Sequence, residues 1–396
     1  MVGWQNLVRG THEASTHLPR SNKIGLSYNA KQNRRRRQQA WIARLGNSEP
    51  TFAFHTSKQS DKREQSDKRE VVWNRVEAQN IRKITPRANL VLQAFNRVAS
   101  GVEGSDVDHK SLIEGAEKCM IPRLDMKDII EGSQGQSSKG GYGTVFLNCV
   151  WRGTESVVVK FFRQVGNKRF ELCLHEMLMQ ALANECCGAT LSLLGFGIKH
   201  GGSQTQGYPF LVIAQRGTTT LWNHLKEVTP CEEEKLHLAI QILKAVSDLH
   251  VHDIVHSDLK GNNIIVVPSL TGGKVVVKLI DFGLTCRVEC TPVKYANRSV
   301  KDKERSLRKC FWLAPEFINP GTRCSKSTDV YALGFVLVEV LTAHLPGKGK
   351  GWDSVKCFRA EGLHNQGVGI EVNKCFGDFY ERPTVNSLLK TFLDNV

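Results

Sequence analysis

The sequence lacks the long apolar stretches that membrane-spanning proteins carry. No stretch approaches the roughly 18 apolar residues that a transmembrane helix requires. The first ten residues contain no apolar run of the kind a secretory signal needs, and Val2 stands where N-myristoylation requires glycine. We therefore expect no transmembrane segment and a protein that stays inside the cell, in the cytoplasm, with the nucleus as the alternative.

Cysteine pairs at metal-binding spacing are also scarce, although the chain has 12 cysteines. Cys286 and Cys290 alone stand near such a spacing, and no second pair completes a four-ligand site. A structural zinc ion is therefore not expected. In an intracellular protein we expect the thiols to be reduced.

Acidic residues are few relative to basic ones: 39 Asp and Glu stand against 54 Lys and Arg, which gives a net charge of +15. The excess is concentrated near the start, because residues 1–120 hold 21 basic and 12 acidic side chains. Arginines fill positions 34–37. A solvated charge cluster is the favoured interpretation of this run, and a nuclear localisation signal or a nucleic-acid contact is the less favoured alternative.

Residues 1–112 show weak hydrophobic periodicity and a repeated pentapeptide, SDKRE, at 60–64 and 66–70. Such a segment buries little apolar surface, so we expect a basic, largely disordered extension. The exception is Val71–Phe95, where a helical pattern is interrupted by Pro86. One or two short helices are expected there, docked on the domain that follows.

From residue 121 the pattern changes, and 40% hydrophobic residues overall suffice for one large core. Short β-branched runs come first, and helical periodicity takes over after Leu221. The strand-like runs are 143–148, 156–162 and 210–214, followed by helical runs at 232–251 and 329–342 with two short strand-like runs between them. We predict an α+β fold over residues 121–396, with a small antiparallel β lobe and a larger helical lobe.

Two segments of the small lobe carry candidate phosphate-binding groups. Residues 138–145 read S-K-G-G-Y-G-T-V, a glycine-rich turn whose amides can approach phosphate oxygens. Residues 157–160 read V-V-V-K, which places Lys160 at the end of an apolar strand. A lysine so placed needs an anionic partner. Glu176 is the favoured partner, with Glu171 as the alternative.

The large lobe carries more specific motifs. Residues 256–263 read H-S-D-L-K-G-N-N, and 281–283 read D-F-G after an apolar strand. Ala314-Pro315-Glu316, Asp329 and Arg382 follow in order. In these motifs the chain resembles the eukaryotic protein kinase family, serine/threonine type. The resemblance implies a two-lobed fold, ATP and Mg²⁺ as cosubstrate and cofactor, and a protein substrate with a serine or threonine acceptor.

The resemblance also assigns roles that suit phosphoryl transfer, which needs aligned reactants and neutralised charge. Asp258 would orient the attacking hydroxyl, and Lys260 would reach the γ-phosphate. Asn263 and Asp281 would bind Mg²⁺, a hard cation that prefers oxygen ligands. Lys160 would hold the α- and β-phosphates, fixed in place by Glu176.

The nucleotide site is assigned by the same matching. Ile213 resembles the gatekeeper, residues 214–217 the hinge that pairs with adenine, and three apolar side chains would enclose the ring. The expected ATP-binding residues are Gly140, Gly141, Tyr142, Gly143, Val145, Val158, Lys160, Ile213, Ala214, Arg216 and Ile265.

Two departures from the family pattern bear on control and specificity. Ser257 stands where most members have an arginine that meets an activation-segment phosphate, a feature typical of the tyrosine-kinase-like group. We therefore expect weak dependence on phosphorylation of that segment. Arg308 and Lys309 stand where serine/threonine kinases usually have Gly-Thr. A pseudokinase scaffold that binds nucleotide or partner proteins is the alternative function.

Overall fold

The computed structural model divides the chain into residues 1–74 and 75–396, and every described residue belongs to the second unit. The described residues are 85–99, 107–130, 137–139, 143–153, 155–163, 168–201, 204–214, 219–268, 275–288, 290, 310–318, 323–343 and 366–395. The basic run at 34–37 and the SDKRE repeats lie outside them.

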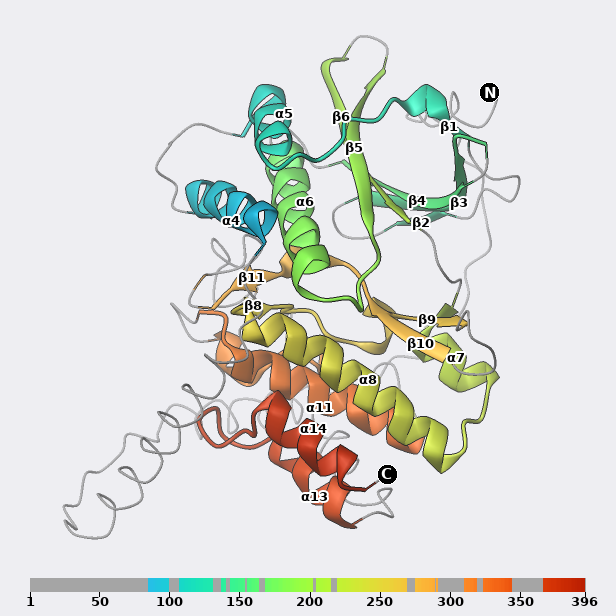
Figure 1. The fold of residues 1–396 in the computed structure, drawn as a ribbon, viewed down its shortest axis with the longest axis vertical. Helices are drawn as coiled ribbons and strands as arrows, with labels where there is room; N and C mark the ends of the chain where they lie inside the picture. Colours follow the sequence, from blue (N-terminus) through green and yellow to red (C-terminus); the bar gives the residue numbers. More distant parts are fainter. Residues whose placement is uncertain are drawn as a thin grey trace, which may run out of the picture. The chain divides into compact units, whose positions relative to one another are not determined.

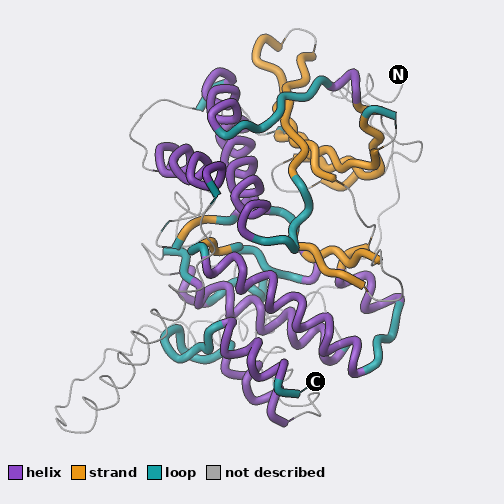
Figure 2. The backbone as a smooth tube through the Cα atoms, in the orientation of Figure 1, coloured by secondary structure: helices purple, strands orange, loops and turns teal. Residues whose placement is uncertain are grey.

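A six-stranded antiparallel sheet forms the small lobe, in the order β1-β3-β4-β6-β5 with β2 paired to β3 (Figures 1 and 2). In β3, Thr144 and Phe146 point inward in alternation. The register then shifts between Phe146 and Cys149, where Asn148 adopts a positive φ of 55° and a bulge forms. The strands are β1 (Ile129–Ile130), β2 (Ser137–Lys139), β3 (Gly143–Trp151), β4 (Glu155–Phe162), β5 (Leu193–Gly201) and β6 (Gln204–Ala214).

Helix α6 (Lys168–Cys186) is buried along 15 of its 19 residues, because it packs against the sheet and against two helices that precede it in the chain. These are α4 (Pro86–Ala99) and α5 (His109–Lys118); in Figure 1 α4 meets α6 from one side and α5 lies beside its upper end. Ala88, Val91 and Phe95 of α4 belong to the same hydrophobic core as α6.

Helix α4 begins at Pro86 rather than being interrupted there. Proline suits the first helical position, since its missing N–H has no helical partner to lose. Thr85 caps the helix, because its hydroxyl accepts the Ala88 N–H at 3.0 Å. Residues 71–84, the rest of the segment expected to be helical, are not among those described.

The large lobe is built around α11 (Lys326–Thr342), 13 of whose 17 residues are buried. Ser325 caps its start, and Ala343 ends it in the left-handed region with φ 52°. Helices α8 (Glu232–Val251) and α13 (Gln366–Lys374) pack against it, and α14 (Val385–Leu393) packs on both of them. Helix α7 (Leu221–Glu227) packs against the short segments that carry the site, among them residues 261–263 and 264–268. Among the described residues, short 3₁₀ turns occur in the large lobe at η2 (Gly261–Asn263), η3 (Phe282–Leu284) and η4 (Pro315–Ile318), and in the small lobe at η1 (Met126–Asp128).

Two small antiparallel sheets are formed by β7, which precedes α8, and by the four strands that lie between α8 and η4 in the chain. One has the order β10-β9-β7, and the other pairs β11 with β8. Their strands are β7 (Thr219–Thr220), β8 (Ile254–Val255), β9 (Ile264–Pro268), β10 (Val275–Leu279) and β11 (Cys286–Arg287).

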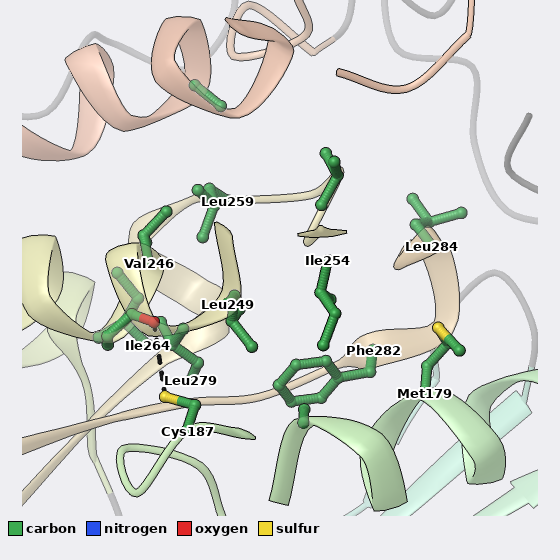
Figure 3. Packing of buried hydrophobic residues seen from close by; sticks show 14 of the residues in the cluster. Met179, Cys187, Val246, Leu249, Ile254, Leu259, Ile264, Leu279, Phe282 and Leu284 are labelled. Carbon is green, nitrogen blue, oxygen red and sulfur yellow. Dashed lines mark hydrogen bonds between the residues drawn. The ribbon is translucent and has the colours of Figure 1, made fainter. Parts of the chain in front are cut away.

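One hydrophobic cluster runs through both lobes. In Figure 3 the ring of Phe282 lies between Met179 of α6 and Ile254 and Leu249 of the large lobe. Cys187, just after α6, donates its S–H to the Ala245 carbonyl at 3.5 Å. The predicted two-lobed α+β fold is therefore confirmed. Within the described ranges, no helix combines the length and apolar character needed to cross a bilayer.

Candidate active site

Lys160 joins the two lobes through two carboxylates. Its Nζ lies 2.7 Å from Glu176 Oε1 and 2.8 Å from Asp281 Oδ1. Lys160 comes from β4, Glu176 from the middle of α6, and Asp281 from the residue before η3. Of the two candidate partners, Glu176 and not Glu171 therefore pairs with the lysine.

Burial and charge act in opposite directions on this trio. Burial alone would raise the pKa of Asp281, but the ammonium groups of Lys160 and Lys260 outweigh it and lower that pKa to about 2. Burial raises the pKa of Glu176 above its usual range, against the opposing effect of Lys160. The pKa of Lys160 is raised, because the two carboxylates outweigh its burial. The lysine is thus cationic and Asp281 is anionic at neutral pH.

The second cluster surrounds Asp258, which is only 9% exposed. Its Oδ2 accepts hydrogen bonds from Lys260 Nζ at 2.6 Å and Asn263 Nδ2 at 3.0 Å. The Asn263 amide also donates to the Asp258 carbonyl at 2.8 Å. Three residues of one short loop therefore lock each other in place.

Asp329 holds this loop from beneath. The N–H groups of His256 and Ser257 donate to its two carboxylate oxygens, each at 2.8 Å. His250 Nε2 lies 3.0 Å from the same carboxylate. Ser257 has a left-handed backbone, φ 64°, and its own N–H and that of the preceding residue are anchored by these two bonds. A fully buried carboxylate thus shapes the loop that presents Asp258.

Asn263 and Asp281 stand at adjacent ends of two paired strands. Ile264 pairs with Leu279, and the Ile280 N–H donates to the Asn263 carbonyl at 3.0 Å. Because the amide nitrogen of Asn263 donates to Asp258, its amide oxygen is the atom left for a cation. The side chain of Asp281 is 42% exposed, so an ionised carboxylate remains accessible. The pair fits a hard cation with oxygen ligands.

The predicted adenine-side residues share one face of the small-lobe sheet. Val145 pairs with Lys160, and Val158 pairs with Ile213, so all four lie on the same face of β3, β4 and β6. Gly143 lies so close to β4 that a Cβ there would come within 1.7 Å of the Phe161 carbonyl oxygen.

Other predicted nucleotide residues are placed in part. Ala214 ends β6 and is half-buried, and Ile265 lies in β9 of the large lobe. Four predicted residues fall outside the part of the chain that the structure describes: Gly140, Gly141, Tyr142 and Arg216.

Two further buried polar residues, one in each lobe, make hydrogen bonds. Arg382 makes a two-pronged contact with Glu316, at 2.6 and 2.9 Å, and donates to the Ser327 carbonyl at 3.0 Å. Arg382 thus ties η4, which contains Glu316, to the first turn of α11. Gln180, buried in α6, donates to the Leu191 carbonyl at 2.7 Å.

Sequence reasoning missed three contacts beside the site. The Trp312 indole N–H donates to Asp258 Oδ1 at 3.0 Å. His175 Nε2 meets the Thr285 carbonyl at 2.9 Å, which connects α6 to the segment after Asp281. Glu339 of α11 is buried beneath Gly261. Each contact spans more than 50 positions in sequence, so no local pattern announces it.

Comparison with known proteins supports the resemblance. The family described as "protein kinase domain" matches residues 135–393. A human relative, mitogen-activated protein kinase kinase kinase 19, is 28% identical over 269 residues, which cover 64% of this chain and 18% of that protein. The Raf homolog serine/threonine-protein kinase of Caenorhabditis elegans is 32% identical over 137 residues, covering 32% of this chain and 16% of that protein.

A plant relative, serine/threonine/tyrosine-protein kinase HT1 of Arabidopsis thaliana, is 37% identical over 120 residues, which cover 30% of this chain and 26% of that protein. In all three relatives the matched part spans about a quarter or less of their own length. The family match, by contrast, covers well over half of this chain and includes both clusters described above. The chain belongs to the protein kinase family.

Proposed function

We propose that this chain transfers the γ-phosphoryl group of ATP, bound with Mg²⁺, to serine or threonine hydroxyls of protein substrates in intracellular signalling. The observation that carries the proposal is the position of Lys160 Nζ, within 2.8 Å of both Glu176 and Asp281. This contact supports the proposal, because the three side chains that would bind phosphate, anchor the lysine and bind Mg²⁺ are in contact. Family members with this arrangement have the groups for phosphoryl transfer in place.

The proposed roles follow from charge and position. Lys160 would bind the α- and β-phosphates, and Asn263 with Asp281 would hold Mg²⁺. The metal ion, when bound, offsets negative charge on the phosphates. Asp258 would accept a hydrogen bond from the acceptor hydroxyl and orient its oxygen. The ammonium group of Lys260, 2.6 Å from Asp258, would offset the negative charge that develops on the transferred phosphoryl group.

Val145, Val158 and Ile265 are proposed to enclose the adenine ring, with Ala214 and the hinge beyond it pairing with the ring edge. Ile213 would border the same space as gatekeeper. Gly140, Gly141, Tyr142 and Gly143 are proposed to cover the phosphates, and Arg216 to line the hinge. These assignments rest on the family motif and, for the described members, on their shared sheet face.

The alternative, a pseudokinase scaffold, would be favoured by loss of a charged group. The charged groups Lys160, Glu176, Asp258 and Asp281 are all present, as is the amide of Asn263. The names of the relatives favour an active enzyme of the tyrosine-kinase-like group. One is a kinase kinase kinase, one a serine/threonine kinase and one a serine/threonine/tyrosine kinase.

We also propose a cytoplasmic location, which fractionation of cells expressing the tagged chain would test.

The test is phosphorylation of myelin basic protein by the full chain with radiolabelled ATP. Wild type should incorporate label, whereas Asp258→Asn and Asp281→Asn should lose about a hundredfold or more of the rate. Asp378→Asn, at an exposed position in the turn after α13, is the matched control and should behave as wild type. Phosphoamino-acid analysis of the product then identifies the acceptor. Label incorporation that persists in Asp258→Asn would contradict the proposed roles.

A further inference from the structure

The indole of Trp312 meets the carboxylate proposed to orient the acceptor. Trp312 lies in the turn 311–313, immediately before Ala314, and its Nε1 is 3.0 Å from Asp258 Oδ1. An indole N–H can only donate, so the direction of this hydrogen bond is unambiguous. Both side chains are at least partly buried, which shields the contact from competing water.

The donors around Asp258 are divided between its two oxygens. Oδ2 accepts from Lys260 at 2.6 Å and Asn263 at 3.0 Å, whereas Oδ1 accepts from Trp312. A carboxylate oxygen offers two lone pairs. Oδ2 is thus occupied by donors of its own loop, and Oδ1 retains capacity for one more donor. Oδ1 is therefore the oxygen available to an acceptor hydroxyl, and Trp312 limits its rotation.

Aromatic contacts hold the indole in turn. The Phe311 ring meets Trp312 edge to face at 5.1 Å, and Phe311 packs on Phe335 of α11 at 5.2 Å. Phe335 also contacts Phe376 at 4.7 Å. The ammonium of Lys260 lies 5.1 Å from the centre of the Trp312 rings, within cation–π range. The indole is thus fixed between the large-lobe core and the lysine that flanks Asp258.

We propose that Trp312 is a positioning residue for phosphoryl transfer, which holds Asp258 Oδ1 in the orientation that receives the acceptor hydroxyl. The inference rests on the proposed role of Asp258. It assigns a role in orienting Asp258 to the segment before Ala314, which lacks the Gly-Thr that serine/threonine kinases usually have at 308–309. Trp312 acts on the acceptor side of the reaction and has no part in nucleotide binding.

The test compares Trp312→Phe, which keeps an aromatic ring and removes the donor, with Trp151→Phe. Trp151 lies in β3 and its indole N–H has no partner in the described part of the chain, so its loss should change nothing. With myelin basic protein as acceptor, kcat of Trp312→Phe should fall about tenfold to a hundredfold, as expected for one hydrogen bond to a charged group. KM for ATP should stay within about twofold of wild type, since the nucleotide contacts are intact.

A double-mutant cycle and a spectroscopic signal separate positioning from a structural role. If Trp312 acts through Asp258, Trp312→Phe should have little further effect on the residual rate of Asp258→Asn. In full-length protein labelled with ¹⁵N-tryptophan, one indole N–H resonance absent from Trp312→Phe should shift in Asp258→Asn. Thermal unfolding midpoints equal to wild type would exclude a folding defect as the cause.

Several results would overturn the inference. An unchanged kcat in Trp312→Phe, alongside an inactive Asp258→Asn, would refute the role of Trp312 and leave the proposed function standing. A raised kcat would show that the indole blocks Asp258 instead of orienting it. Equal losses in kcat and in ATP affinity would indicate a general distortion. No phosphorylation by the wild type would refute the proposed function and this inference with it.

Discussion

Glu339→Gln should make the stability of the protein less sensitive to pH. Glu339 lies in α11, is 3% exposed, and its Oε2 has no hydrogen-bond partner among the described residues. It lies against the loop 256–263 that carries Asp258, here called the catalytic loop, where a Cβ on Gly261 would come within 2.7 Å of that oxygen. Burial raises the pKa of Glu339 to about 8, against a smaller opposing effect of the Gly261 N–H.

The magnitude follows from the difference in proton binding between the two states. In the unfolded chain this carboxyl has a pKa near 4.5, and in the folded protein the pKa is about 8. Between pH 5.5 and 7.5 the unfolded form is ionised and the folded form is mostly protonated, so unfolding releases a proton. Each pH unit then lowers the free energy of unfolding by about 1.4 kcal/mol, or somewhat over 2 kcal/mol across this interval. The stabilisation is complete below pH 4.5 and is lost as pH rises through 8.

Urea unfolding of wild type and Glu339→Gln at pH 5.5 and 7.5 measures this difference directly. Glutamine has nearly the same shape and cannot ionise, so the variant should gain about 2 kcal/mol over wild type on going from the lower to the higher pH. Comparison between the two proteins cancels the other titrating groups. Glu381→Gln, at an exposed position, should track wild type at both pH values. If wild type and Glu339→Gln lose stability in parallel, the carboxyl is ionised in the folded protein and the reasoning fails.

Three further predictions concern activity and domain limits. Lys160→Met should lower kcat about a hundredfold or more while the protein stays folded, and a rate within a few-fold of wild type would exclude Lys160 from the ATP site. Removal of residues 1–84 should leave a cooperatively unfolding domain. Removal of residues 1–112 should lower the unfolding midpoint or the solubility, because burial of Phe95 and Val91 alone contributes about 3 to 5 kcal/mol. Equal unfolding midpoints for the two truncated proteins would show that α4 does not stabilise the domain. The triple variant Thr291→Ala, Ser299→Ala, Ser306→Ala, at positions outside the described residues, should keep most of its activity in a protein phosphorylation assay, and a hundredfold drop would show that another cation reads an activation-segment phosphate.

The order of the motifs was enough to predict the fold and the candidate catalytic residues. Asp258, Lys260 and Asn263 are hydrogen-bonded within the single segment H-S-D-L-K-G-N-N. The motif alone, like D-F-G, therefore identifies the interacting side chains without knowledge of the tertiary structure. The partner of Lys160 was less certain, because Glu171 and Glu176 both lie in one helical stretch. Only the packing of α6, which buries Glu176 and leaves Glu171 partly exposed, decides between them.

The start of the folded part was harder to infer. Helix α4 has an apolar face of Ala88, Val91 and Phe95, but such a face does not reveal what it packs against. In the structure the Phe95 ring lies 5.8 Å from the ring of His175, whose Nε2 meets the Thr285 carbonyl. Burial lowers the pKa of His175 to about 4, so the ring is neutral and fits this apolar setting. We therefore propose that the folding unit includes α4 and begins near Thr85, earlier than the predicted limit of 121.

Neutral contacts occupy the place where many kinases have a phosphate-reading arginine. The Ser257 hydroxyl lies 3.5 Å from Cys286 Sγ and 3.3 Å from Cys324 Sγ. Burial raises the pKa of Cys286 well above its usual range, so this thiol is uncharged. The cluster joins the catalytic loop to β11 and to the residue before Ser325, the N-cap of α11, and the Cys324 N–H donates to the Cys290 carbonyl at 2.8 Å. An arginine buried here would need an anion to offset its charge, whereas a hydroxyl and two thiols need none. The start of the activation segment is thus held by contacts that exist without phosphate, which is the physical basis for expecting activity that depends little on phosphorylation.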